Sequence, residues 1–202
     1  MKLLIVTPLY PPDIAPLALY VKELAQRLKE THTVTILAYN HIPEFIPGVT
    51  IVTIEKNKVL PIRLFHFIIT LLKLRRDVDA VYLQNGPSVE LPGIITSFLS
   101  KKRLIVGIND EVALSHAVSN LFYKLLLRLL IHKSHKTVIH HTLTANIKIV
   151  LNDFLSKKIT TIIKPYARPE ILPFSTYPSD AFHDYESSWE EHVRELTHLF
   201  SS

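Results

Sequence analysis

The sequence contains no cysteine and only four glycines among its 202 residues. The absence of cysteine excludes disulfides, thiolate metal sites and a cysteine nucleophile, and it is compatible with a reducing compartment. Both the G-x-G-x-x-G fingerprint and the Walker phosphate loop depend on closely spaced glycines, and neither motif occurs in this sequence. A self-contained dinucleotide or ATP site of those kinds is therefore not expected.

Long uncharged apolar runs are also absent. A membrane-spanning helix needs roughly 18 to 20 consecutive apolar residues, and the longest apolar stretches, 59–74 and 121–131, are interrupted by basic residues. The apolar start of the chain is broken by Pro8, Pro11 and Pro12, too early for a signal peptide. We expect a soluble or peripheral protein of the cytoplasm, the peripheral form lying at the inner face of the membrane.

Composition and charge indicate a globular domain with a basic surface. Hydrophobic residues make up 48% of the chain and charged residues 20%, which is not the composition of a disordered segment. The net charge of +5 suggests an anionic partner such as a phosphate, a nucleotide or an anionic lipid, although an ordinary basic surface explains it equally well. Lysine and arginine are dispersed and form no recognised motif, so nucleic acid is not an expected partner.

Apolar runs of strand length alternate with stretches of helical periodicity. Residues 3–7 form an apolar run ended by prolines, as expected of a buried parallel strand. Residues 17–28 then place apolar side chains on one helical face. The alternation predicts an α/β fold, a doubly wound, mainly parallel Rossmann-like sheet. Further strands are expected at 33–39, 49–54, 79–83, 103–108, 136–140 and 158–163, and further helices at 62–74, 91–99, 117–131 and 143–155.

The chain divides into three parts. Residues 1–172 form the Rossmann-like domain, and residues 173–186 are rich in proline and serine and are predicted to be a linker. Residues 187–202 form a C-terminal amphipathic helix whose start is marked by the capping-box pattern of Ser188 and Glu191. So short a helix does not bury its apolar face alone, so it should dock back onto the first domain. That face consists of Trp189, Val193, Leu196 and Phe200.

Polar residues follow several predicted strands at their carboxyl ends, where ligands collect in open parallel sheets. Because these ends meet at one edge of the sheet, we expect them to line one crevice. The alternative role of each is to cap the following helix. The candidates for the acceptor or ligand crevice are Asp13, Ala15, Pro16, Gln84, Asn85, Gly86, Asn109, Asp110, His141 and Thr142.

Two predicted helices carry basic residues beside apolar ones. One interpretation is docking to an anionic membrane that carries a lipid-linked acceptor; the favoured alternative is two core helices with their charges in water. The histidines between residues 132 and 141 are irregularly spaced and lack acidic neighbours, so no metal site is expected. The membrane or anion candidates are Lys73, Arg75, Arg76, Lys124 and Arg128.

Several segments resemble the family-4 GT-B glycosyltransferases. The opening of that family looks like KLLIVTPLYPPD at residues 2–13, YVKELAQRL at 20–28 and HTVTIL at 32–37. Weaker similarity occurs at TVIHHT, residues 137–142, and at TIIKPYA, residues 161–167, where the family crosses into its second domain. The tail segment SWEEHVREL, residues 188–196, resembles the family's last helix, which crosses back to the N-terminal domain.

The resemblance implies the N-terminal, acceptor-binding lobe together with the crossover helix. The lobe that holds the nucleotide sugar would be missing, and no two glutamates here have seven residues between them, as the family's donor-binding pair does. Ala15 and Pro16 stand where the family carries glycines near the donor diphosphate, and proline offers no N–H to phosphate. Asn109 stands where a histidine is frequent, and an amide is no general base.

The expected function is the acceptor-binding half of a hexosyl-transferring glycosyltransferase that is inactive without a donor-binding domain. Expected partners are a sugar or lipid-linked acceptor, a donor-binding glycosyltransferase subunit and an anionic membrane surface. No cofactor is expected to bind tightly, and a nucleotide sugar is the donor only if a donor domain is supplied. Catalytic residues are not assigned. The alternatives are a non-catalytic binding or scaffold module derived from the same lobe, and an excised piece of a full enzyme.

Overall fold

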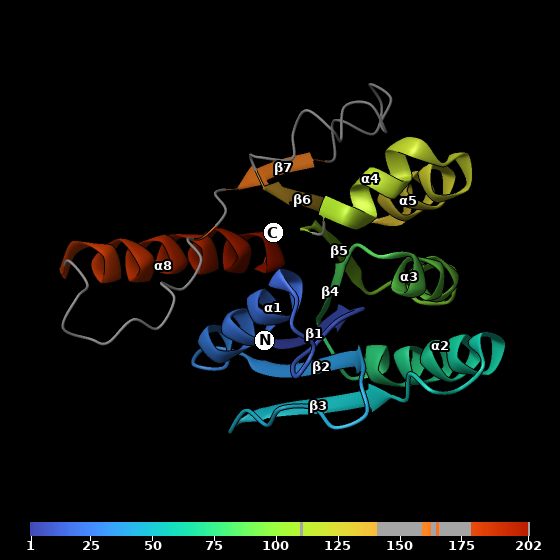
Figure 1. The fold of residues 1–202 in the computed structure, drawn as a ribbon, viewed down its shortest axis with the longest axis horizontal. Helices are drawn as coiled ribbons and strands as arrows, with labels where there is room; N and C mark the ends of the chain where they lie inside the picture. Colours follow the sequence, from blue (N-terminus) through green and yellow to red (C-terminus); the bar gives the residue numbers. More distant parts are fainter. Residues whose placement is uncertain (110, 141–158, 163–164, 166–178, 202) are drawn as a thin grey trace.

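The computed structural model describes residues 1–109, 111–140, 159–162, 165 and 179–201. Within them the chain forms a seven-stranded sheet of order β3-β2-β1-β4-β5-β6-β7 (Figure 1). Every neighbouring pair is parallel, so the predicted α/β doubly wound class is confirmed. The strands are β1 (Lys2–Thr7), β2 (Thr33–Tyr39), β3 (Val49–Ile54), β4 (Ala80–Gln84), β5 (Arg103–Ile108), β6 (Lys136–His140) and β7 (Ile159–Ile162).

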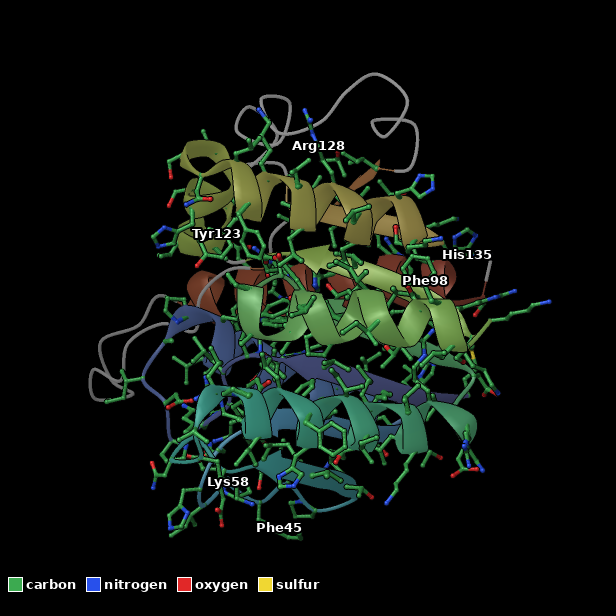
Figure 2. All side chains as sticks on the ribbon, turned by 90° about the vertical axis from the view of Figure 1, so that its right-hand side faces the viewer. Phe45, Lys58, Phe98, Tyr123, Arg128 and His135 are labelled. Carbon is green, nitrogen blue, oxygen red and sulfur yellow. The ribbon has the colours of Figure 1, made fainter. Side chains whose placement is uncertain are left out.

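Helices cover both faces of the sheet, which explains why the central strands are continuously apolar. Leu4 and Val6 of β1 point into a core shared with α2, α3, α4 and α5, whereas Leu3 and Ile5 point into a core shared with α1 and α8. Figure 2 shows α2, α3 and α5 side by side across the first face. The helices are α1 (Pro16–Leu28), α2 (Leu60–Arg76), α3 (Pro87–Leu99), α4 (Glu111–Ser119), α5 (Leu121–Lys133) and α8 (Ser179–Ser201).

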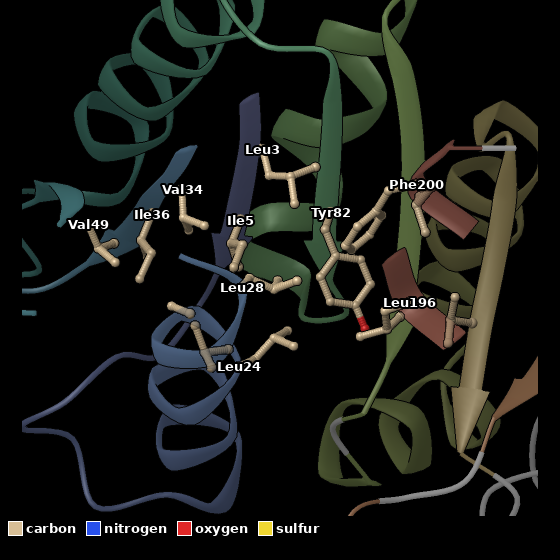
Figure 3. Close-up of a cluster of buried hydrophobic side chains, with 14 of the residues drawn as sticks. Leu3, Ile5, Leu24, Leu28, Val34, Ile36, Val49, Tyr82, Leu196 and Phe200 are labelled. Atoms are coloured by element: carbon tan, nitrogen blue, oxygen red, sulfur yellow. The ribbon is translucent and has the colours of Figure 1, made fainter. Parts of the chain in front are cut away.

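The C-terminal helix α8 docks onto the sheet beside α1, as predicted. Its residues Leu196 and Phe200 are fully buried against Tyr82 of β4 and belong to the same core as Leu24 of α1 (Figure 3). Arg27 of α1 adds a bidentate ion pair to Glu186, with N–O distances of 2.9 and 3.1 Å. The helix is therefore fixed by an apolar face and by a charged pair at its flank.

Helix α8 begins at Ser179, earlier than the predicted start at residue 187. Ser187 and Ser188 lie inside the helix, where their hydroxyls donate to the carbonyl oxygens of Asp184 and Tyr185 at 3.2 and 2.8 Å. The capping-box interpretation of Ser188 is therefore wrong, because the helix continues through it. Serine is compatible with a helix interior when its hydroxyl bonds back to the preceding turn, and buried Tyr185 extends the apolar face upstream.

The helix predicted at 117–131 is two helices. Asn120 separates α4 from α5, and its side-chain oxygen accepts a hydrogen bond from the N–H of Phe122 at 2.9 Å, which caps α5. The two helices meet at an angle of 114°. Among the described residues no single helix is long and apolar enough to span a bilayer, although this bent pair meets the length and composition criteria together. The helix predicted at 143–155 lies outside the described residues.

Helix α3 begins at Pro87 and contains Pro92, so it is longer than the predicted 91–99. A proline inside a helix leaves the carbonyl four residues earlier without its usual donor. That carbonyl belongs to Ser88, and the hydroxyl of Tyr39 donates to it at 3.1 Å. A side chain from β2 thus replaces the missing backbone donor and allows the helix to pass through the proline.

Candidate ligand-binding site

The loop between β1 and α1 lies at the carboxyl end of the central strand. Asn40 Nδ2 donates to the carbonyl oxygens of Tyr10 and Pro11, each at 2.9 Å, and fixes the loop from the end of β2. Asp13, a predicted crevice residue, accepts from Lys56 Nζ, which lies 2.6 Å from Oδ1. Its neighbour Ile14 is 99% exposed. The carboxylate of Asp13 thus holds the loop, and the outermost side chain is apolar.

Ala15 and Pro16 form the start of α1. Ala15 is the extended residue before the helix and provides no side-chain cap, and Pro16 is the first helical residue. A proline there fits the helix but has no N–H, so this helix end offers one donor fewer to an anion than glycine would give. The geometry makes the start of α1 a weak phosphate site.

The turn after β4 packs directly against the loop after β1. Gly86 has a φ of +152°, and a Cβ at this position would lie 2.9 Å from Cγ of Pro8. The N–H of Gly86 donates to Glu90 Oε1 at 2.9 Å, and that carboxylate is itself buried. Glycine is therefore required for the close approach of the two loops at the carboxyl ends of β1 and β4.

Three of the predicted crevice residues meet at the ends of β4 and β5. The N–H of Asn109 donates to Asn85 Oδ1 at 2.9 Å, and Asn109 Nδ2 donates to Gln84 Oε1 at 2.6 Å. Gln84 and Asn85 are fully buried, and Asn109 is partly exposed. The sequence also allows these residues to cap the helices that follow them. The described contacts are of another kind, because the amides bind one another across the strands.

Two atoms of this amide cluster have no hydrogen-bond partner. Nε2 of Gln84 and Oδ1 of Asn109 are both buried and unpaired. An unpaired buried polar atom costs about 1–3 kcal/mol, so such atoms usually mark a place for water or a ligand group. One is a donor and the other an acceptor, and hydroxyl groups can bind to either kind of atom. The cluster is thus chemically suited to a hydroxyl-bearing ligand.

A chain of phenols connects the amide cluster to helix α8. Asn109 Nδ2 also lies 3.3 Å from the hydroxyl of Tyr82, which lies 3.4 Å from the hydroxyl of Tyr20. The Tyr20 oxygen is 2.8 Å from Nε2 of His192 on α8. Burial raises the pKa of Tyr82, and burial with the neighbouring Tyr82 hydroxyl raises the pKa of Tyr20 well above its usual value. Both phenols are therefore protonated at neutral pH and act in hydrogen bonding, not as bases.

The remaining predicted site residues are separated from this cluster or lie outside the described part. Asp110, His141 and Thr142 are outside the described residues. Among the basic candidates, Lys73 and Arg76 on α2 are exposed, and Lys124 and Arg128 on α5 are half-buried (Figure 2 labels Arg128).

Arg75 differs from the other basic candidates because it is 1% exposed. Its guanidinium donates to Thr96 Oγ1 at 3.1 Å and to the carbonyl oxygens of Ser100 and Lys102 at 3.4 and 3.0 Å. Burial lowers the pKa of Arg75. The side chain joins α2 to the end of α3, so Arg75 does not belong to an exposed basic surface.

Sequence reasoning missed Tyr20, Tyr82 and His192 as members of the polar cluster. Tyr20 belongs to the apolar periodicity of the helix predicted at 17–28, and the other two residues belong to a strand and to the tail. His192 comes from a helix 172 positions away from Tyr20. The one available signal is the position of Tyr82 in β4, two residues before Gln84 and on the same side of the strand.

No protein-family model matches the sequence, and no curated protein matches it either. Solved structures do match its fold. One is the crystal structure of Anabaena Alr3699/HepE in complex with UDP-glucose, with a TM-score of 0.56 and 17% identity over 82% of this chain. Another is a Listeria monocytogenes protein assigned as a UDP-N-acetylglucosamine 2-epimerase, with a TM-score of 0.55 and 14% identity over 78% of this chain.

The present chain spans 44% of the length of each of these two proteins. At such identities the likeness shows the fold alone. That fold is a parallel α/β sheet with a helix docked back from the C-terminus, as described above.

Proposed function

We propose that this chain is the N-terminal, acceptor-binding half of a GT-B glycosyltransferase and that sugar transfer requires a separate donor-binding domain. The observation that carries the proposal is the amide cluster of Gln84 and Asn109, with one unpaired donor and one unpaired acceptor at the carboxyl end of the sheet. The fold likeness to two proteins of about twice the length, one in complex with UDP-glucose, is in agreement with it.

The chemistry of the groups around the amide cluster fits recognition better than catalysis. The amides and the two protonated phenols offer hydrogen bonds to hydroxyl groups, as an acceptor sugar requires. The carboxylate of Asp13 is engaged with Lys56, and that of Glu90 with the N–H of Gly86. The imidazole of His192 is fully buried beside Tyr20. In this proposal the donor-binding domain and its nucleotide sugar supply the groups that carry out the transfer.

The lone chain is expected to bind UDP-glucose more weakly than about 1 mM, because Pro16 removes one backbone donor from the start of α1 and the donor-binding domain is not supplied. Isothermal titration with UDP-glucose measures this affinity. Adding a purified donor-binding glycosyltransferase chain from the same genome at micromolar concentration should restore transfer of radiolabelled glucose to a sugar acceptor. Micromolar binding of UDP-glucose by the lone chain, or no complex between the two chains, would contradict the proposal.

The complementation assay has a matched pair of variants. Gln84→Leu removes the unpaired donor and should reduce transfer by the complex about tenfold or more, as expected for a lost substrate hydrogen bond. Lys101→Gln changes an exposed residue before β5, at the opposite end of that strand from Asn109, and should leave transfer unchanged. Circular dichroism establishes that both variants are folded before activity is compared.

The second candidate function is a non-catalytic module that docks on a membrane or on a partner transferase. It is favoured by α5, where Leu121, Leu125 and Leu129 are 71%, 49% and 49% exposed and follow one helical face. Lys124 and Arg128 lie on the same helix. An apolar stripe beside cations is typical of helices that lie in an anionic membrane surface.

Sedimentation with liposomes separates the two candidates. A membrane module should pellet with vesicles of anionic phosphatidylglycerol and lose that binding at high salt, because surface attraction is screened. Leu125→Asp should abolish pelleting, and Leu19→Asp is the matched control, since Leu19 is an exposed leucine of α1. Indifference to anionic lipid removes the membrane version of this function.

A further inference from the structure

Strand β3 forms one edge of the described sheet, and its outer side carries free backbone groups. The carbonyl oxygen of Ile54 accepts from the N–H of Asn40 at 3.1 Å, so the hydrogen-bonding groups of Ile54 face β2. These groups alternate in direction along a strand, so the N–H and C=O groups of Ile51 and Thr53 point away from β2. No described strand lies beyond β3, so an added strand has donors and acceptors to bind there.

A groove runs beside this edge, between the end of β3 and the outer face of α2. It has a volume of about 340 Å³. On the helix side the apolar lining includes Phe65 and Ile69, which are 61% and 37% exposed. Figure 2 shows α2 at this margin of the molecule, with Lys58 and Phe45 labelled nearby. The groove therefore offers an apolar surface directly next to the unpaired edge of β3.

The groove carries a positive charge. Its titratable lining residues are Lys58, His66 and Lys73 against a single carboxylate, Glu55. Lys58 lies 3.8 Å from Glu55 with both side chains exposed, a pair that contributes little. No ion pair within the described residues involves Lys73. The groove thus favours an acidic occupant.

We propose that this groove binds an extended, acidic segment of a partner polypeptide, which adds as a strand to β3. The backbone groups of Ile51 and Thr53 bind its main chain, Phe65 and Ile69 receive an apolar side chain, and Lys73 faces an acidic one. This is the physical pattern of β-strand addition, in which main-chain bonds give affinity and side-chain seats give selectivity. A second copy of this chain fits poorly, because two-fold pairing of β3 with itself brings the two basic grooves together.

The first test uses a fluorescein-labelled octapeptide with glutamate, valine, valine and glutamate at its odd positions and threonine between them, measured by fluorescence anisotropy at low salt; because strand side chains alternate between faces, its valines and glutamates all point to the same side. It should bind saturably. A version with N-methylated amides at alternate positions, which removes the main-chain donors, should bind about tenfold or more weakly. A version with lysine in place of both glutamates should lose a similar factor, because its charges repel Lys58 and Lys73 of the groove. Equal binding of the N-methylated and unmodified peptides would overturn the proposal.

The second test changes the edge itself. Thr53→Pro removes the outward N–H while leaving the ladder to β2, because proline is tolerated where the N–H faces away from the sheet. It should reduce peptide binding about tenfold, whereas the control Thr53→Val keeps the N–H and should bind as the parent does. If Thr53→Pro fails to fold by circular dichroism, Lys58→Glu with Lys73→Glu takes its place. A dimer that either variant converts to a monomer would show that the occupant is a second copy, against the proposal.

Discussion

Replacing Phe200 with alanine should lower the free energy of unfolding by about 3–5 kcal/mol, the range for removing a fully buried phenylalanine. Phe200 is 0% exposed, and its ring meets Tyr82 edge-on with a centroid distance of 5.6 Å. The substitution leaves a cavity between α8 and the sheet that the rigid strand β4 does not fill. The measurement is urea unfolding followed by the fluorescence of Trp189, the single tryptophan, which lies on the same helix and is 4% exposed.

Phe45→Ala is the matched control, because Phe45 is 79% exposed and lies in the loop before β3. Its removal should change the unfolding free energy by no more than about 0.5 kcal/mol. The emission of Trp189 adds a local readout: in native Phe200→Ala it should move to longer wavelength if the end of α8 loosens. Similar small effects for both variants would mean that α8 is not part of the core.

The arrangement of the sheet follows from the sequence because its strands are buried on both faces. A run such as residues 3–6 has no polar side, and only a parallel sheet between two helical layers accommodates it. The docking of α8 follows equally from its amphipathic sequence, because an apolar helical face gains most of its stability by packing on the rest of the protein. Both predictions are confirmed, since they depend on patterns within single elements.

The element boundaries were harder to predict, because tertiary contacts decide them. The sequence predicts a helix from residue 91, but the hydroxyl of Tyr39 supplies the donor that Pro92 withholds from Ser88, and the helix begins at Pro87. The break at Asn120 depends on its side chain, which caps the start of α5. This cap competes with an uninterrupted helix through the apolar stretch. The capping-box pattern at Ser188 predicts a helix start, but Tyr185 is buried upstream of it and α8 continues through both residues.

The candidate site was predictable only in its sheet-borne part. That Gln84 and Asn109 lie together follows from the rule that parallel strands end at one edge. The contribution of His192 does not follow, because no local pattern specifies which residue of α8 reaches Tyr20. Arg75 was expected at the surface from its place in a basic cluster, yet the bend between α3 and β5 presents carbonyl oxygens that bind it inside.

Gly107→Ala should destabilise the protein by about 3 kcal/mol, at the upper end of typical overpacking effects. A Cβ at position 107 would lie 2.5 Å from the hydroxyl oxygen of Tyr82 and 2.7 Å from the ring carbon that bears it. Tyr82 is fully buried between α1 and α8, so its ring has no free space to move into. Strand β5 is central, which leaves the backbone equally constrained. Thermal and urea unfolding of the variant measure the effect.

A double-mutant cycle identifies the clash as the cause. Tyr82→Leu removes the ring, so Gly107→Ala should cost at least about 1 kcal/mol less in that background than in the parent, a coupling expected only for residues in contact. Additive effects would show that position 107 is sensitive for another reason. Because Tyr82 also contacts Phe200 and lies 3.3 Å from Asn109, a displaced ring should shift the Asn109 side-chain amide resonances in the native Gly107→Ala variant. The same phenol therefore supports the docked tail on one side and orients the amide cluster on the other.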